Sequence, residues 1–208
     1  MKTALLGGSF DPVHLGHLFL LHCAVSLTDY RRFVIMPAKQ SNFKRESTPS
    51  ASDEQRLAML NLALEDYREI YPQDNICSKV LEISDMEINR GGISYTIDTV
   101  NALLEQKCNG TQSERIGVII GDDHIALLQK WYRFEELKDK VEFLICRRNN
   151  ERAGFENIKL PSGVVARIIQ ADNVSPESAT DIRKDVMSHL NYLSPRVREY
   201  VVEHKLYV

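Results

Sequence analysis

Short apolar runs alternate with helical patterns along almost the whole chain, and the first of these runs lies at its start. Residues 3–6 and 33–36 have the composition of buried strands, and residues 17–27 between them have a helical pattern. Further strand-like runs follow at 116–120, 141–146 and 164–169. This alternation predicts an α/β fold, a doubly wound, Rossmann-like parallel sheet with helices on both faces.

The segments between these runs predict the remaining elements. A long amphipathic helix begins at Asp53, which we expect to be its N-cap. The other expected elements are an extended segment at 80–88, a helix at 97–106, a helix after Asp123, and two closing helices, the second with Ser194 as cap and Pro195 at its first position. We expect a single domain over residues 1–208, with the C-terminal helical part, about 176–208, integral to it.

Charge and cysteine content narrow the class of ligand. The formal net charge is −3, which gives no general attraction to nucleic acid or to a membrane surface, so we expect a small substrate and neither of those partners. The four cysteines form no CxxC pair and are predicted to be reduced. The first apolar run ends in glycine before it reaches the length of a signal peptide, and no later run has membrane-spanning length, so we expect a cytoplasmic protein.

The stretch GGSFDPVHLGH, residues 7–17, follows the first predicted strand. Its glycines allow a sharp turn in which backbone N–H groups approach an anion directly. His14 and His17 are three residues apart, so both imidazoles lie on one face of the first helical turn, where the helix dipole is positive. The pattern predicts a phosphate-binding turn. A purely structural turn is one alternative, and a zinc site of His14, His17 and His22 is another, although no cysteine or carboxylate completes its tetrahedron.

A second group of polar residues lies far downstream, in VSPESATDIRKDV. Ser178 and Asp181 have the spacing of a capping box, which alone explains both residues. Arg183 is different, because a cation in the first turn of a helix opposes the helix dipole unless an anion binds at the same end. We therefore predict that Arg183 contacts a phosphate. A solvated surface arginine is the alternative.

GSFDPVHLGH, with its HxGH core, and SATDIR together resemble the HxGH adenylyltransferases of the nucleotidyltransferase superfamily, and among them most closely the bacterial nicotinate-nucleotide adenylyltransferases. Further matching stretches follow in the family's order: Lys44 after the second strand, RGGISYTIDTV at 90–100, GDDHIALLQKWY at 121–132 and CRR at 146–148. The resemblance implies transfer of AMP from ATP to nicotinate mononucleotide, giving nicotinate adenine dinucleotide and pyrophosphate in NAD biosynthesis. It implies Mg²⁺ held mainly by the ATP phosphates, with no protein metal site.

The resemblance also implies roles for individual residues. His17, His14 and Arg183 are the implied catalytic residues, with His17 the main stabiliser of the transferring phosphate. The implied ATP-binding residues are Gly8, Ser9, Phe10, His14, His17, Lys44, Asp123, Ser178, Thr180 and Arg183. The implied nicotinate mononucleotide pocket consists of Tyr95, Thr96, Asp98, Trp131 and Tyr132, with Trp131 stacked on the pyridine ring. From the residues alone, composition favours a place in the core for Trp131, and Asp98 and Asp123 could cap helices.

Four positions depart from the family pattern. Asn42 and Phe43 precede Lys44 where a proline and a histidine are usual, Ala179 replaces a common hydroxyl residue, and Asp122 stands where a small residue is common. The alternatives within the superfamily are adenylyltransferases specific for nicotinamide mononucleotide or pantetheine phosphate. Outside it they are a nicotinamide-dependent oxidoreductase, disfavoured by the missing GxGxxG fingerprint, and a non-catalytic nucleotide-binding module. A homo-oligomer is one alternative for the assembly state.

Overall fold

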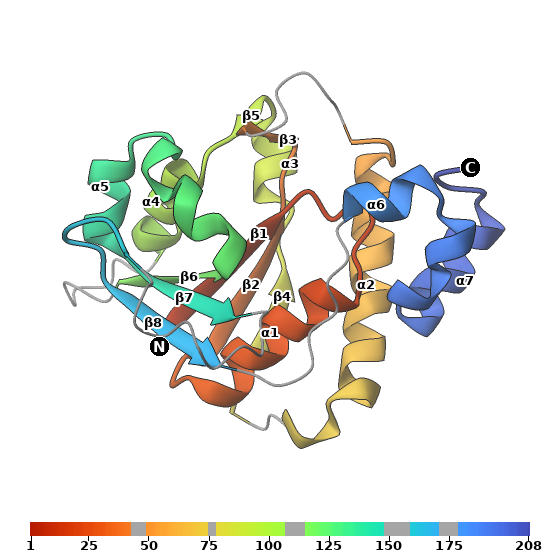
Figure 1. The fold of residues 1–208 in the computed structure, drawn as a ribbon, viewed down its shortest axis with the longest axis horizontal. Helices are drawn as coiled ribbons and strands as arrows, with labels where there is room; N and C mark the ends of the chain where they lie inside the picture. The colour runs from red at the N-terminus through yellow and green to blue at the C-terminus, as the bar shows by residue number, and fades with distance from the viewer. Residues whose placement is uncertain (43–48, 75–77, 107–114, 148–158, 171–178) are drawn as a thin grey trace.

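The computed structural model describes residues 1–42, 49–74, 78–106, 115–147, 159–170 and 179–208. Six strands form one parallel sheet in the order β4-β2-β1-β6-β7-β8 (Figure 1). The strands are β1 (Thr3–Gly8), β2 (Arg32–Pro37), β4 (Val80–Ile83), β6 (Ile116–Gly121), β7 (Val141–Arg147) and β8 (Ala166–Gln170). Two short strands, β3 (Gln40–Ser41) and β5 (Ile93–Ser94), pair separately. The predicted α/β fold with a parallel sheet is confirmed.

Strand order reverses at the centre of the sheet. β1 pairs with β2 on one side and with β6 on the other, so the first half of the chain extends the sheet in one direction and the second half in the opposite direction. In open parallel sheets a crevice forms where the order reverses, outside the carboxyl ends of the strands. Here that place follows β1 and β6, and the stretch GGSFDPVHLGH begins there.

Helices cover both faces of the sheet, and side chains alternate between two hydrophobic clusters along each central strand. In β7, Leu144 and Cys146 join the cluster under α1 (Leu15–Leu27) and α2 (Asp53–Ile70). Phe143 and Ile145 join the cluster under α4 (Thr96–Gln106) and α5 (Phe134–Lys140). Burial on both faces explains why the strand sequences are apolar without interruption.

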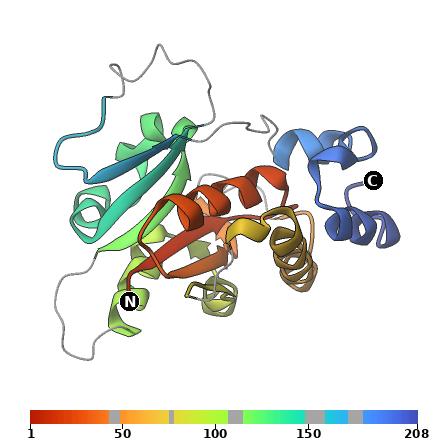
Figure 2. The same cartoon turned by 90° about the horizontal axis from the view of Figure 1, so that it is seen from below.

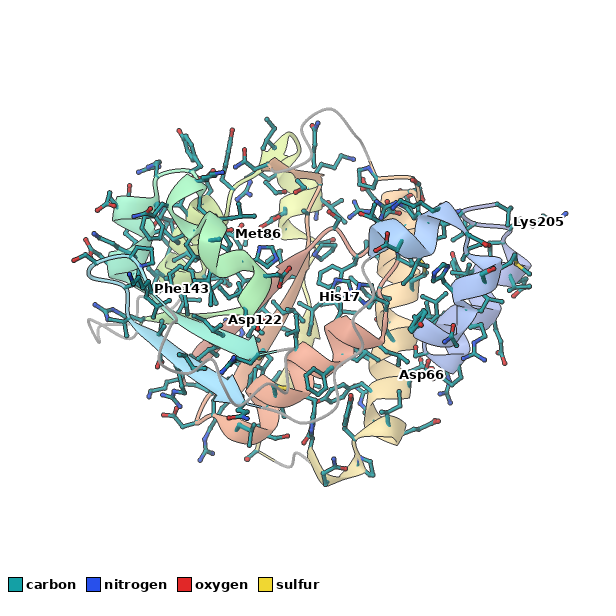
Figure 3. All side chains as sticks on the ribbon, in the orientation of Figure 1. His17, Asp66, Met86, Asp122, Phe143 and Lys205 are labelled. Atoms are coloured by element: carbon teal, nitrogen blue, oxygen red, sulfur yellow. The ribbon has the colours of Figure 1, made fainter. Side chains whose placement is uncertain are left out.

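The closing segment lies beside α2 at one end of the molecule (Figures 1 and 2). It contains α6 (Ala179–Lys184), the 3₁₀ helix η5 (Met187–Tyr192) and α7 (Pro195–Glu203). Ser194 is the N-cap residue of α7 and Pro195 its first residue, as predicted. Asp66 of α2 lies toward α7 (Figure 3) and accepts hydrogen bonds from the backbone N–H of Arg196 at 2.9 Å and its Nη1 at 2.6 Å. These contacts fix α7 on α2.

The predicted N-cap of α2 is wrong. Ser52, not Asp53, precedes the helix: its Oγ accepts the Gln55 N–H at 3.2 Å, and Gln55 Oε1 accepts the Ser52 N–H at 2.8 Å. This reciprocal capping box is the stronger pattern in the sequence Ser-Asp-Glu-Gln. Asp53 lies in the first turn instead and binds Arg56 at 2.6 Å.

Two further segments differ from expectation. The extended segment predicted at 80–88 ends at Ile83 as β4, and α3 (Met86–Arg90) follows, because a short apolar run fits either periodicity. The helix after Asp123 is a 3₁₀ helix, η3 (Asp122–Lys130), followed by α5. A third 3₁₀ helix, η2, covers Pro72–Asp74. Among the described segments, none of the helices combines the length and apolarity that crossing a membrane requires.

Candidate active site

A cavity of about 410 Å³ opens at the carboxyl ends of β1 and β6, where the strand order reverses. His17 lies at the start of α1, near the centre of the molecule (Figure 3). The predicted site residues that line this one cavity are Gly8, Ser9, Phe10, His14, His17, Tyr95, Thr96, Asp123, Trp131, Tyr132, Thr180 and Arg183. Segments far apart in the sequence therefore meet around a single space. Lys44 and Ser178 lie outside the described residues.

The turn after β1 is tightly packed. Phe10 has left-handed backbone geometry, with φ of 46°, and its side chain is buried. A Cβ atom on Gly8 would lie 3.2 Å from the Phe10 ring, so glycine leaves the room that this ring occupies. The same ring packs against His17 with a centroid separation of 4.9 Å. Phe10 in this turn therefore helps to position the imidazole of His17 through direct contact.

The two histidines are held together at the start of α1. His14 is the N-cap residue in extended conformation, and the ring centroids of His14 and His17 are 3.8 Å apart. The backbone N–H of His14 donates to Nδ1 of His17 at 3.2 Å. Nδ1 is then an acceptor, so the neutral ring carries its hydrogen on Nε2. His17 is thereby kept in the tautomer whose Nε2–H can donate to a phosphate oxygen.

Arg56 fixes the backbone beneath the turn, although the sequence analysis did not select it. Its side chain is completely buried, and Nη1 donates to the carbonyl oxygens of Ser9 at 2.8 Å and Ala38 at 2.7 Å. Because Arg56 binds both carbonyl oxygens, it links the turn after β1 to the residue that follows β2. The sequence does contain a signal for Arg56. It lies four residues before Leu60 and seven before Ala63, so a charged residue shares the apolar face of the predicted helix.

Arg183 approaches the same turn from α6, but it lies in the last turn of that helix and not in the first turn, where the sequence analysis placed it. Its Nη1 donates to the carbonyl oxygen of Asp11 and lies 3.7 Å from the Asp11 Oδ2, while Nη2 donates to the Thr180 Oγ1 at 3.4 Å. Asp11 is buried and also accepts the backbone N–H groups of Ser50 at 2.8 Å and Ala51 at 3.0 Å. Asp11 therefore joins the opening turn, the start of α2 and α6. The sequence analysis missed it because its partners are distant in the chain.

Aromatic side chains form the opposite wall of the cavity. The rings of Tyr95 and Tyr132 are 4.2 Å apart between centroids. Trp131 packs edge-on against Phe143 at 6.0 Å and against His124 at 6.4 Å, while also lining the cavity. The two interpretations of Trp131, core residue and cavity wall, are thus compatible.

A buried carboxyl group also lines the cavity. Glu87 of α3 lines the cavity and accepts a hydrogen bond from the Thr99 hydroxyl. Burial raises the pKa of Glu87, and hydrogen bonds from Thr99 and Ser94 partly oppose that shift. The Ser94 Oγ also accepts the Lys39 N–H at 3.0 Å. These contacts hold the SYT segment in place, and Glu87 was not selected from the sequence.

Asp98 does not line the cavity. It lies in the first turn of α4, where its Oδ1 is 4.0 Å from the Arg133 Nη1. It is therefore not the N-cap of that helix, and Asp123 is not an N-cap either, because Gly121 precedes η3. A contact between Asp98 and a substrate stays a prediction.

His22 belongs to a different cluster. Its Nδ1 lies 2.6 Å from the Oδ2 of Asp74, and its ring stacks on Tyr71 at 4.1 Å. The zinc alternative required His22 to face His14 and His17, and the structure directs it elsewhere. Within the described ranges, no three His, Cys, Asp or Glu side chains are grouped as metal ligands.

Comparison with known proteins agrees with this geometry. The sequence model of the cytidylyltransferase-like family matches residues 5–185. A protein of Treponema pallidum (strain Nichols), named a probable nicotinate-nucleotide adenylyltransferase, is 33% identical over 100% of this chain and 99% of its own length. One from Pectobacterium atrosepticum with the same name is 32% identical over 99% of this chain and 98% of its own. The chain belongs to the cytidylyltransferase-like family.

Solved structures show the same fold. Plasmodium falciparum nicotinic acid mononucleotide adenylyltransferase, complexed with NaAD, superposes with a TM-score of 0.75 at 19% identity, covering 100% of this chain and 98% of that one. A complex of that enzyme with APC gives 0.72 at 18% identity over 99% and 96%. The family predicted from HxGH and SATDIR is confirmed.

Proposed function

We propose that this chain is a nicotinate-nucleotide adenylyltransferase. It transfers AMP from ATP to nicotinate mononucleotide and releases nicotinate adenine dinucleotide and pyrophosphate. One observation carries the proposal: a single cavity has hydrogen-bond donors for phosphate on one wall and aromatic rings on the other. The names of the relatives in the family support it.

The chemistry requires no enzyme nucleophile. The phosphate of nicotinate mononucleotide attacks the α-phosphorus of ATP in line, a new P–O bond forms, and the bond to pyrophosphate breaks. Negative charge grows on the oxygens around the α-phosphorus. In this proposal the Nε2–H of His17 and the His14 side chain at the start of α1, with Arg183 of α6, would donate to that charge.

The remaining predicted ATP contacts complete this wall. Gly8, Ser9 and Phe10 would contact ATP from the turn after β1, and Asp123 from the start of η3, which follows β6. Thr180 would contact it from α6. Lys44 and Ser178 stay in the proposal on the strength of the sequence resemblance, and they lie outside the described residues.

Mg²⁺ belongs to the proposal as the partner of ATP. In the described part of the chain, no three His, Cys, Asp or Glu side chains lie together as possible ligands of the ion. The triphosphate oxygens are suitable ligands for this hard cation, which binds phosphates together with few protein groups. When bound, the ion neutralises charge on the triphosphate and helps pyrophosphate to leave.

The aromatic wall would bind nicotinate mononucleotide. The ring of Trp131 would stack on the pyridine ring, next to the Tyr95 and Tyr132 pair. Backbone N–H groups near Thr96 and Tyr132 would donate hydrogen bonds to the nicotinate carboxylate, which favours the acid over the amide substrate. In this proposal the protein is cytoplasmic, and residues 176–208 form part of the same domain.

The test is pyrophosphate release from ATP with three acceptors in parallel: nicotinate mononucleotide, nicotinamide mononucleotide and phosphopantetheine. We expect release with nicotinate mononucleotide to exceed the other two, and mass spectrometry to find nicotinate adenine dinucleotide. Preferential use of another acceptor would move the chain to a different adenylyltransferase. A non-catalytic nucleotide-binding module would release no pyrophosphate with any of them.

A further inference from the structure

Tyr207, near the end of the chain, reaches the turn that carries the catalytic histidines. Its hydroxyl donates to Oδ1 of Asp11 at 2.8 Å, although the two residues are 196 positions apart. Asp11 is 3% exposed, and its carboxylate also accepts the backbone N–H groups of Ser50 and Ala51. Three neutral donors from the described residues therefore converge on one buried negative charge.

The backbone around Tyr207 has an uncommon conformation. After α7, Lys205 and Tyr207 have left-handed φ angles of 49° and 64°. Residues other than glycine adopt this region at a cost, so surrounding contacts must maintain it. Leu206 between them is buried, and its N–H donates to the Val201 carbonyl at 3.0 Å. The segment is anchored in the core and directs the phenol toward Asp11.

The charge on Asp11 matters because Arg183 lies beside it. Arg183 Nη1 is 3.7 Å from the Asp11 Oδ2, beyond hydrogen-bond length, and donates to the Asp11 backbone carbonyl instead. Asp11 and a phosphate of ATP would compete for the same guanidinium. Each neutral donor that binds the carboxylate makes it a weaker competitor, because it stabilises the negative charge without using the arginine.

Tyr207 remains a donor throughout the physiological pH range. Burial and the neighbouring Asp11 carboxylate both raise the pKa of the Tyr207 hydroxyl above its ordinary value of 10.0. The hydroxyl therefore keeps its proton at neutral pH.

We propose that Tyr207 is a positioning residue for Arg183: by donating to the Asp11 carboxylate, it leaves the guanidinium available for the triphosphate of ATP. The inference rests on the proposed function, because it assumes that ATP occupies the cavity that Arg183 lines. It adds to the ATP site a residue that lies outside the sequence motifs and acts without touching the substrate.

The direct test compares the equilibrium dissociation constants of ATP with Mg²⁺ for the wild type and Tyr207→Phe, by isothermal titration calorimetry. The substitution removes one hydroxyl and keeps the ring. We expect the dissociation constant and the KM for ATP to rise about threefold to tenfold, the range for one lost hydrogen bond. The KM for nicotinate mononucleotide should change by less than about twofold, because the aromatic wall is untouched.

Tyr200→Phe is the matched control. Tyr200 lies in α7, and its ring stacks on His204 at 3.9 Å instead of facing Asp11. The same loss of a hydroxyl there should leave ATP binding at the wild-type value. An equal loss of ATP affinity in both variants would overturn the proposal, because it would show a general effect on the closing segment.

A second comparison separates positioning from simple stabilisation. In an Arg183→Gln background, Tyr207→Phe should not weaken ATP binding further, because the guanidinium through which Tyr207 acts on ATP is absent. A lower melting temperature with unchanged ATP affinity of the folded protein would reject the role of Tyr207, and so would full additivity of the two substitutions. Because titration with ATP needs no turnover, it tests Tyr207 even if the pyrophosphate assay rejects the proposed acceptor.

Discussion

The two walls of the cavity are built in different ways. The phosphate wall consists of the turn after β1, the start of α1 and the cavity-lining residues of α6. Behind it, Arg56, 0% exposed, and Asp11, 3% exposed, hold the turn after β1 through hydrogen bonds to backbone groups. On the aromatic wall, the contacts are mainly between rings: Tyr95 packs on Tyr132, which is 47% exposed, and Trp131 packs on Phe143. The first wall is rigidly cross-linked, whereas the second is a packed but open surface.

This difference matches the proposed ligands. Stabilising charge that develops during phosphoryl transfer requires donors that are already in place, since reorganising them during the reaction costs free energy. Binding a flat pyridine ring requires mainly an apolar face and some adaptability. Substitutions on the phosphate wall should therefore lower kcat, whereas substitutions on the aromatic wall should raise the KM for nicotinate mononucleotide. The following predictions test that separation.

The largest effect is expected for His17→Ala. Loss of one preorganised donor to the transferring phosphate should lower kcat by at least about a hundredfold. His22→Ala is the control on the same helix, because His22 pairs with Asp74 outside the cavity, and its kcat should stay close to the wild type. Steady-state kinetics with ATP and nicotinate mononucleotide measure both. A His17→Ala variant with near-wild-type turnover would remove His17 from the mechanism.

Arg183→Lys should have the next largest effect. Lysine keeps the charge but cannot reproduce the planar, multiple-donor contact of the guanidinium, so we expect a loss of about tenfold to a hundredfold in kcat/KM for ATP. Lys184→Ala removes a neighbouring exposed cation, whose side chain is 70% exposed and paired with Asp181. Its kinetics should match the wild type. Similar losses in both variants would indicate a diffuse charge effect and contradict a specific role for Arg183.

Trp131→Ala tests the aromatic wall. Loss of the stacking surface should raise the KM for nicotinate mononucleotide by about tenfold, with the KM for ATP within about twofold of the wild type. Trp131→Phe should recover part of the affinity because it restores an aromatic face. If the KM for ATP rises as much as that for nicotinate mononucleotide, the two walls are not functionally separate.

The smallest effect concerns Glu87. Burial raises its pKa above the ordinary 4.5, so the folded protein binds this proton more tightly than the unfolded chain. The contribution of Glu87 to the free energy of unfolding is therefore fully present below about pH 4.5 and decreases as pH rises through the folded-state pKa. Glu87→Gln should be more stable relative to the wild type at pH 8 than at pH 4.5.

Urea unfolding of wild type and Glu87→Gln at both pH values measures this difference. Comparing the two proteins at each pH cancels the titration of the other groups. A difference in unfolding free energy that does not change with pH would mean that Glu87 does not titrate as its burial implies.

Much of the fold could be predicted because it depends on local patterns. The apolar run before Gly7 became β1, and the helical pattern that follows became α1. Boundaries were less secure: Ser52 took the capping position expected for Asp53, and α3 interrupted an expected extended segment. Competing local patterns of similar strength cannot be ranked without the surrounding packing.

The site was only partly predictable. His14 and His17 could be found because their spacing places both at one helix start. Arg183 was selected for a wrong reason, because it lies in the last turn of α6 and not in the first, although it does line the cavity. Asp11 and Tyr207 act through contacts across 172 and 196 residues of chain, which no local pattern encodes. The structure adds these cross-links, and they explain how the predicted residues come to share one cavity.

The central claim is that the phosphate wall binds the triphosphate of ATP through both His17 and Arg183, while the aromatic wall binds nicotinate mononucleotide. A crystal structure of the chain with a non-hydrolysable ATP analogue and nicotinate mononucleotide tests it most directly. We predict that His17 Nε2 and the Arg183 guanidinium both lie within about 3.2 Å of phosphate oxygens, with the pyridine ring stacked on Trp131. A triphosphate bound away from either His17 or Arg183 would contradict the account.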